Sequence, residues 1–438
     1  MPRILYVAYH FPPIGGGGVQ RNAKFVRYLP EFGYEPVVVT GPGGATDRWT
    51  PSDESLNADV PAGTEVHRLP GPEPQISGGI RAALERRLML PAPFVRWWQE
   101  GAEAVGGPAG HDCDLVYGSL VPYETAAPVA RVAAKLHKPW VADLQDPWAL
   151  DEMWLYPSGL HRRVDLRRMR QLLGRADAVV MNTPEAVERV RKAFPELRSR
   201  LVVSIPNGFD SADFNGDPTP RADGKFRIVH TGYLHTDTGL RTRQVAGFRK
   251  LLGGRYLPAD LYTRSHVFLL EGLRQAVQED PSLADTVEVV LAGVATETDR
   301  RIAAGAAVEV RMPGYVSHGE TVDLLRTGDL LFLPMHDLAD GTRAGLVPGK
   351  TYEYLAARRP ILAAVPDGDA RDLLAAAGNA FLCRPPDSAA MARIVAQEVE
   401  RWRRGDPPAV PDAEVLARYE RRHLTEELAG VFDGLLGR

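Results

Sequence analysis

The stretch from Ile4 to Thr40 restricts the fold more than any other part of the sequence. A buried strand is predicted at residues 4–8, then four glycines at 15–18, an amphipathic helix, and a second strand at 36–40. A strand, a loop, a helix and a strand in this order predict parallel strands joined by a right-handed crossover. Glycines after the first strand let a ligand approach the backbone, although a merely flexible turn is the alternative interpretation. The run is not G-x-G-x-x-G and no acid follows Val39, which argues against a nicotinamide cofactor.

The same alternation of apolar runs and helical segments continues along the chain. Strand-and-loop segments are expected at residues 114–119, 139–148, 178–184, 201–210, 226–233, 287–293, 308–317, 330–336 and 360–365. A chain of 438 residues is too long for one core. We therefore predict two α/β domains with parallel sheets, at residues 1–208 and 222–410. No structure is predicted for the polar segment 235–263, and residues 413–436 indicate one long amphipathic helix whose placement the periodicity leaves open.

Charge and cysteine content exclude several classes of protein. The net charge of −4, without a dense basic stripe, argues against a nucleic-acid binder. Cys113 and Cys383 lack metal-type spacing, so both are expected to be reduced and to pack as small apolar residues. The first apolar run is too short for a signal peptide, and no stretch approaches the length of a membrane span. A cytoplasmic protein is expected, and the arginine- and alanine-rich composition is typical of high-GC bacteria.

The basic and aromatic segment at residues 81–98 has two interpretations. Four arginines lie among aromatic and aliphatic side chains, a composition typical of a surface that contacts a membrane. Pro91 and Pro93 interrupt the helix, so packing on the protein's own surface is preferred and peripheral membrane contact is the second interpretation.

Two acids stand at the predicted end of a buried strand. Asp143 and Asp146 come before Pro147, at the carboxyl edge of the sheet where ligands bind in such folds. A carboxylate at this place can orient an acceptor hydroxyl or take its proton. The alternative is that either acid caps a turn or a helix.

Residues 348–360 predict a tight turn, a helix and a buried strand. Lys350 and Thr351 lie in the first helical turn, where free backbone N–H groups favour an anion such as phosphate. Glu353 follows three residues after Lys350, near the same face of the helix. The pattern suggests a nucleotide-diphosphate site, and a solvated Lys and Glu on an ordinary helix is the alternative.

Together these motifs resemble the glycosyltransferases of the GT-B fold, family 4, over nearly the whole chain. The match is to the branch with Pro-x-Lys-x-x-Glu-Tyr-Leu. The motifs that carry the resemblance are Tyr9-His-Phe-Pro-Pro with the glycines at 15–18 and Arg21, Asp143-Leu-Gln-Asp-Pro-Trp, Asn182-Thr-Pro, Pro206-Asn-Gly-Phe-Asp, Thr231-Gly-Tyr, Pro313-Gly-Tyr-Val and Pro348-Gly-Lys-Thr-Tyr-Glu-Tyr-Leu-Ala-Ala.

The resemblance implies two Rossmann-like domains facing a cleft. The C-terminal domain would bind most of a nucleotide-diphosphate-sugar donor, and the last helix, within residues 413–438, would cross back to the N-terminal domain. A hexose-type sugar would pass to an acceptor hydroxyl with retention of anomeric configuration, without a bound metal or other cofactor. The acceptor would be a small molecule, a glycan or a lipid-linked molecule at the inner face of a membrane.

The resemblance also implies roles for individual residues. Asp143, Asp146, Lys350 and Arg264 are predicted as catalytic residues. The donor would be bound by the Val316 backbone at the base, by Glu353 at the ribose, by Lys350 or Thr351 with the backbone near Val347 and Gly349 at the diphosphate, by the loop at Gly232 and Tyr233, and by Gly16 and Gly17 of the N-terminal domain.

Two positions depart from the family pattern. Gly345 stands where the first acid of a Glu-x7-Glu pair is usual, and the insertion at 235–263 replaces the usual diphosphate cations. Arg241, Arg243 and Arg264 are the candidates for that charge. The departures keep open an epimerase-like GT-B enzyme or a non-catalytic nucleotide-sugar-binding scaffold.

Overall fold

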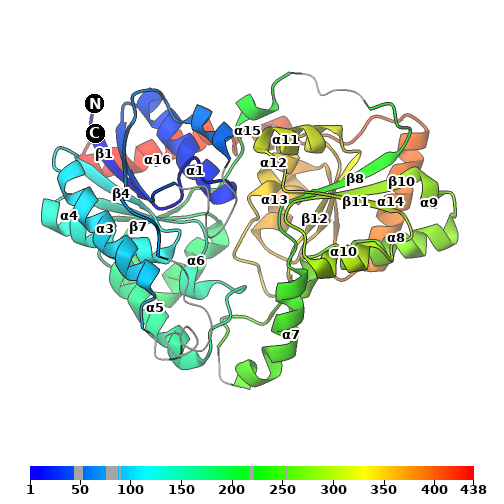
Figure 1. Cartoon of the computed structure of the whole chain (residues 1–438), viewed down its shortest axis with the longest axis horizontal. Helices are drawn as coiled ribbons and strands as arrows, with labels where there is room; N and C mark the ends of the chain where they lie inside the picture. Colours follow the sequence, from blue (N-terminus) through cyan, green and yellow to red (C-terminus); the bar gives the residue numbers. More distant parts are fainter. Residues whose placement is uncertain (44–52, 75–86, 88–89, 217–220, 252–253) are drawn as a thin grey trace. The chain divides into compact units, whose positions relative to one another are not determined.

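The chain forms two compact units, which are described separately here. The structure is a computed structural model that describes residues 1–43, 53–74, 87, 90–216, 221–251 and 254–438 (Figure 1). Unit 1 contains Met1–Asp151, Tyr156–Gly208 and Arg421–Arg438. Unit 2 contains Glu152–Leu155 and Phe209–Glu420.

Unit 1 is built on a parallel sheet. Its described strands, in the spatial order β3-β2-β1-β4-β5-β6-β7, number seven. Because β1 lies between β2 and β4, the strand order reverses there, and the loops after β1 and β4 leave in opposite directions. The strands are β1 (Arg3–Ala8), β2 (Glu35–Thr40), β3 (Glu65–Arg68), β4 (Leu115–Ser119), β5 (Trp140–Leu144), β6 (Ala178–Met181) and β7 (Leu201–Ser204).

Helices cover both faces of this sheet, because alternate residues of a buried strand point to opposite sides. Ile4 and Tyr6 belong to the core beneath α1 and α16, and Leu5 faces the glycines of α3. The red helix α16 lies beside α1 in Figure 1, although 393 residues separate Tyr28 from Arg421 along the chain. The helices are α1 (Gly17–Tyr28), α3 (Pro93–Ala109), α4 (Ala126–Leu136), α5 (Gly159–Leu173), α6 (Pro184–Ala193) and α16 (Arg421–Leu436).

Unit 2 repeats the plan with a second parallel sheet. Six described strands form this sheet, in the order β11-β10-β8-β12-β14-β15. Two more strands of the unit, β9 and β13, pair in a small antiparallel ladder. The strands are β8 (Phe226–Thr231), β9 (Ala259–Asp260), β10 (Val287–Ala292), β11 (Glu309–Gly314), β12 (Leu330–Pro334), β13 (Asp337–Leu338), β14 (Ile361–Ala364) and β15 (Ala380–Cys383).

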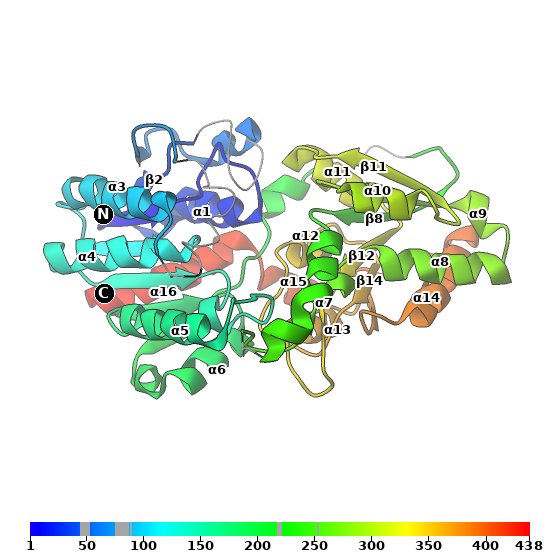
Figure 2. The same ribbon diagram turned by 60° about the horizontal axis from the view of Figure 1, so that its bottom comes forward.

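The helices of unit 2 enclose two cores, one on each face of the sheet. The packed pair α8 and α14, side by side in Figure 2, covers one face, and α12 with α13 covers the other. The helices are α7 (Thr236–Leu251), α8 (Val267–Glu279), α9 (Leu283–Thr286), α10 (Glu297–Ala303), α11 (His318–Thr327), α12 (Lys350–Ala356), α13 (Asp369–Ala377), α14 (Ser388–Arg403) and α15 (Ala413–Ala417). The expected fold class of two Rossmann-like α/β domains is confirmed.

The expectation of one long last helix was wrong, and the structure assigns elements to the polar segment for which none had been predicted. The predicted single helix at 413–436 is two helices, α15 and α16. The chain leaves the helical path between them because the Tyr419 carbonyl accepts a hydrogen bond from the Phe209 N–H, at 2.9 Å. The segment 235–263, left without a structure by the sequence, contains α7, β9 and the 3-10 turn η7 (Leu261–Thr263).

Thr183 caps α6 by accepting a hydrogen bond from the Ala186 N–H. Both cysteines are free and buried, as the sequence predicted. Burial raises the pKa of the Cys113 thiol to about 11, so it stays protonated at neutral pH. In the part of the chain that the structure describes, no helix is long and apolar enough to cross a membrane.

The basic and aromatic segment is only partly described. Arg81, Arg86 and residues 88–89 lie outside the described residues. Phe94 and Trp98 of α3 are buried and pack edge-on against Tyr9, so these aromatic side chains belong to the core of unit 1.

Candidate functional site

A buried histidine at the end of β8 lies against Lys350. His230 Nδ1 donates a hydrogen bond to the Phe332 carbonyl at 2.9 Å, so Nε2 is the ring atom without a proton. Lys350 Nζ lies 3.3 Å from this Nε2. Burial, followed by the charge of Lys350, holds the pKa of His230 well below its usual value. The ring is therefore a neutral acceptor that supports the Lys350 ammonium.

Arg264 is a second cation near Lys350. It follows the turn η7 and is half-buried. Burial lowers the pKa of Lys350 to about 7, the charge of Arg264 acts in the same direction, and Glu353 opposes both. Two partly buried cations repel each other, and an anion bound between them would offset this repulsion and stabilise both charges. The charges of Arg264 and Glu353 therefore both act on Lys350, and the site made of these three residues stays a prediction.

The other two candidate arginines differ from Arg264. Arg243 is paired with the Asp260 carboxylate at 2.5 Å and lies over the Tyr262 ring. Arg241 is exposed on α7. Neither acts on the pKa of Lys350, so Arg264 is the candidate that the structure favours.

Gly232 makes room for the Lys350 side chain. Its φ of 97° lies in the left-handed region, and a Cβ built there would be 2.8 Å from Lys350 Nζ. The preceding Thr231 N–H donates to the Tyr354 hydroxyl at 2.9 Å, which ties this loop to α12. Tyr233 follows with 44% of its surface exposed.

The start of α12 carries the remaining predicted donor residues. Gly349 precedes a helix of only seven residues, whose dipole is correspondingly small. The two cations, rather than this helix end, are therefore the candidate groups for holding an anion. Val347 is buried just before it, and Thr351 is buried with its Oγ1 atom lacking a partner among the described residues. Val316 is half-buried, directly before the Ser317 cap of α11.

Asp143 of unit 1 lies in a closed ion pair. Its carboxylate accepts from Arg21 Nε at 2.9 Å and from Arg21 Nη2 at 3.1 Å, and both side chains are buried. The Tyr117 hydroxyl also donates to it. Burial, followed by the charge of Asp143, raises the pKa of Tyr117 well above its usual value, so the hydroxyl keeps its proton. This environment favours the alternative of a structural role for Asp143.

Asp146 has a more open position than Asp143. It is half-buried in the loop after β5, whereas the residues around it are buried. Burial raises the pKa of Tyr123 well above its usual value, and the charge of Asp146 adds to this effect. The Tyr123 ring stacks on Trp148 at 5.0 Å. In the same unit, Gly16 caps α1 with a φ of 106°, and Gly17 is the first helical residue rather than part of a loop.

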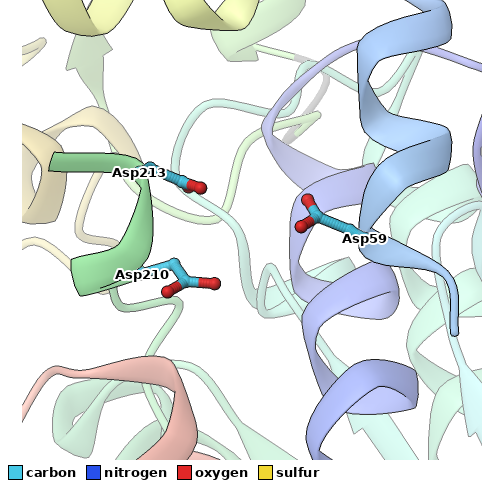
Figure 3. A group of neighbouring side chains, drawn as sticks. All are labelled: Asp59, Asp210 and Asp213. Carbon is cyan, nitrogen blue, oxygen red and sulfur yellow. The ribbon is translucent and has the colours of Figure 1, made fainter. Parts of the chain in front are cut away.

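Figure 3 shows three aspartates that come from different units. Asp59 is the last residue of the turn η2 (Glu54–Asp59) in unit 1. Asp210 directly precedes the turn η6 (Ser211–Phe214) of unit 2, and Asp213 lies within this turn. Asp59 pairs with Lys24 at 2.8 Å and with Arg27 at 2.6 Å. Asp210 caps η6 through the Ala212 N–H, and Asp213 contacts His318 at 3.0 Å. Each carboxylate has a structural partner within its own unit, and we assign no metal site to them.

Comparison with known proteins decides the family. Residues 16–208 match the model of a glycosyl transferase 4-like domain, and residues 254–400 match the model of glycosyl transferases group 1. The chain belongs to the glycosyltransferases described by these two models. No curated protein sequence matches this glycosyltransferase.

Solved structures share the fold of this glycosyltransferase at low sequence identity. Anabaena Alr3699/HepE in complex with UDP-glucose has a TM-score of 0.62 at 16% identity, covering 99% of this chain and 100% of its own. The α,α-trehalose-phosphate synthase (UDP-forming) of Burkholderia vietnamiensis has a TM-score of 0.56 at 13% identity, covering 100% of both chains. A putative UDP-N-acetylglucosamine 2-epimerase from Listeria monocytogenes has a TM-score of 0.55 at 13% identity, covering 99% and 96%.

Sequence reasoning missed three residues of the candidate site. His230 and His336 both stand at the ends of predicted strands, a place that could have drawn attention to them. Glu152 carries no such signal, because the chain before and after the segment Glu152–Leu155 belongs to unit 1 while the segment itself packs in unit 2.

Proposed function

We propose that this protein transfers a sugar from a nucleotide-diphosphate sugar to an acceptor hydroxyl, with the donor bound by unit 2. The observation that carries the proposal is the pair of cations, Lys350 and Arg264, beside the neutral His230 ring. The UDP and UDP-glucose complexes of HepE support a uridine nucleotide as the first donor to test.

These two cations would contribute to catalysis because negative charge develops on the diphosphate leaving group during transfer. When the bond between the anomeric carbon and the diphosphate oxygen breaks, its electron pair moves to the diphosphate. Lys350 and Arg264 then stabilise the transition state more than the ground state. The acceptor oxygen forms the new bond to the anomeric carbon and gives up its proton, and we propose that the half-buried Asp146 carboxylate is the base that takes this proton.

The finer properties of the reaction are part of the same proposal. We propose retention of anomeric configuration, a hexose-type sugar and independence from metal, with Glu353 at the ribose and Val316 at the base. The acceptor is a small molecule, a glycan or a lipid-linked molecule, and the site of action is the cytoplasm or the inner face of the membrane. The family resemblance supports these points.

An epimerase-like reaction is the second candidate. The structural likeness to a protein named as a UDP-N-acetylglucosamine 2-epimerase, together with Gly345 at the usual position of an acid, favours keeping it. Such an enzyme acts on a nucleotide sugar without an acceptor, so the dependence of product formation on an acceptor separates the two.

A ligand screen followed by turnover tests the proposal. Nucleoside diphosphates and their sugars are added to the protein, and the rise in unfolding temperature ranks them, because a ligand stabilises the state that binds it. Nucleotide release is then measured with and without candidate acceptors. Release that needs an acceptor supports transfer, an altered nucleotide sugar without release supports epimerisation, and binding without turnover supports a scaffold. A protein that none of these ligands stabilises would contradict a nucleotide-sugar function.

A further inference from the structure

The buried Glu152 belongs to a four-residue segment that packs in unit 2, the unit that we propose binds the donor. Glu152–Leu155 belongs to unit 2, although Asp151 and Tyr156 on either side of it belong to unit 1. Glu152 Oε1 accepts a hydrogen bond from the Gly345 N–H at 2.9 Å and lies 3.2 Å from His336 Nε2. The side chains of Glu152 and His336 are both fully buried. A buried carboxylate is costly unless it is hydrogen-bonded, so this contact sets the geometry around it.

The carboxylate determines which nitrogen of His336 carries the proton. A carboxylate accepts, so Nε2 of His336 is the donor and Nδ1 of a neutral ring presents a lone pair. Among the described residues, this Nδ1 is buried and has no hydrogen-bond partner. A buried acceptor without a hydrogen bond is unfavourable, which makes such an atom a candidate for ligand contact.

His336 lies in the same part of unit 2 as Arg264, because Thr263 Oγ1 donates a hydrogen bond to the Met335 carbonyl at 3.0 Å, and these two residues directly precede Arg264 and His336. His336 follows the end of β12 by two residues, and Gly345, bound by the same carboxylate, precedes Lys350 by five. Burial lowers the pKa of His235 to about 2, and Arg264, Lys350 and His336 add to this effect in that order. The same segment also contacts Arg264, since Met153 Sδ lies 3.0 Å from Arg264 Nη1.

We propose that Glu152 and His336 together recognise the sugar of the donor: Glu152 fixes the ring of His336, and Nδ1 of His336 accepts a hydrogen bond from a sugar hydroxyl. This inference rests on the proposed function. The ionised oxygens of a diphosphate accept hydrogen bonds and do not donate them, so a lone pair in this part of unit 2 needs a different group of the donor. A hydroxyl supplies that hydrogen. Glu152 is a positioning residue, and His336 is the residue that touches the ligand.

The test compares each nucleoside diphosphate with its own sugar nucleotide. The pairs are UDP with UDP-glucose, ADP with ADP-glucose, GDP with GDP-mannose and dTDP with dTDP-glucose, and the pair bound best by the unchanged protein is titrated by calorimetry. His336→Gln keeps a donor for Glu152 but lacks the Nδ1 acceptor. We expect it to weaken the sugar nucleotide about tenfold, the value of one hydrogen bond, and the diphosphate less than twofold.

Two further variants separate recognition from folding. His336→Asn places a polar atom near the position of Nδ1 and should retain part of the preference for the sugar nucleotide. If Glu152 acts through His336, then Glu152→Gln combined with His336→Gln should cost no more than His336→Gln alone. His423→Gln, at a half-exposed position of α16, is the control and should change neither affinity.

Different results would contradict the role of His336, the role of Glu152 and the proposed function. Equal losses for the diphosphate and the sugar nucleotide, or no loss for either, would overturn the assignment of His336. Additive losses in the double variant would overturn the positioning role of Glu152. An unchanged protein that binds none of the four pairs contradicts the proposed function itself.

Discussion

Lys350 Nζ lies 3.3 Å from His230 Nε2, the ring nitrogen that has no proton because Nδ1 donates to the Phe332 carbonyl. A cation held by a neutral acceptor, with Arg264 as the next charge, is poised to gain from an arriving anion. This relationship is the basis of the first two predictions.

Lys350 should take up a proton when a nucleoside diphosphate binds. Burial lowers its pKa from 10.5 to about 7, so above pH 7 a part of the Lys350 side chains in the ligand-free protein has lost the proton. The bound diphosphate favours the charged form and raises this pKa, so protons are absorbed and affinity falls as pH rises from about 7 to about 9. Calorimetry in buffers of different ionisation enthalpy measures the uptake.

Two variants control this measurement. Lys350→Ala should abolish the uptake and weaken the diphosphate, whereas Lys135→Ala, at an exposed position of α4, should change neither. Unchanged affinity and proton uptake in Lys350→Ala would show that this lysine is not a diphosphate cation.

Gly232→Ala should impair diphosphate binding more than stability. The new Cβ would lie 2.8 Å from Lys350 Nζ and displace the ammonium, and the positive φ of 97° adds a backbone cost of about 1–2 kcal/mol. Gly378→Ala has a similar backbone cost at φ 77° but meets no atom within 4 Å. Both variants should therefore lose similar stability in thermal unfolding, and only Gly232→Ala should lose affinity for the diphosphate. If Gly232→Ala and Gly378→Ala bind the diphosphate with equal affinity, the Lys350 side chain can move away from the new Cβ and still bind the ligand.

Glu353→Ala should weaken nucleoside diphosphates by about tenfold or more, because a hydrogen bond to a charged group is worth about 1.5–3 kcal/mol. If Glu353 accepts from the ribose hydroxyls, inorganic pyrophosphate, which has no ribose, should lose less affinity than the nucleoside diphosphate, because Glu353 affects it only through its charge near Lys350. In turnover the variant should mainly raise the donor KM, since a ribose contact is the same in the ground and transition states. Glu414→Ala, at an exposed position of α15, serves as the control. A fall in kcat alone would refute the ribose role.

Asp143 and Asp146 should differ in what their removal changes. Asp143→Asn breaks the buried ion pair with Arg21 and should lower the free energy of unfolding by about 3–5 kcal/mol. Asp146→Asn, at a loop position that is half-buried rather than fully buried, should lower it by less than Asp143→Asn does. Urea titration followed by tryptophan fluorescence compares the two.

Activity adds a second comparison for Asp146. Asp146→Asn should lower acceptor-dependent turnover and leave calorimetric binding of the donor intact, because we place this acid on the acceptor side. Loss of donor binding would instead assign Asp146 a structural role.

The local sequence pattern was sufficient for the fold. Apolar runs ending in glycine or acid, alternating with amphipathic helices, predicted both parallel sheets. Lys350, Arg264 and Glu353 were named before the structure, from the motif and from the family resemblance, and their place in the site stays a prediction. The break before α16 was not predicted, because it depends on a hydrogen bond from Phe209, far away along the chain.

By itself the sequence determined that this protein has two parallel-sheet domains, since hydrophobic periodicity is a property of neighbouring residues. Only the tertiary structure decided which polar groups meet. His230 and Lys350 are 120 residues apart, and Glu152 and His336 are 184 apart. Their contacts follow from the order of strands in the sheet and from the folding of Glu152–Leu155 into unit 2, and burial lowers the pKa of both His230 and Lys350. Residue types predict the chemistry that a site can perform, but packing decides whether an acid such as Asp143 faces a ligand or is enclosed in the core.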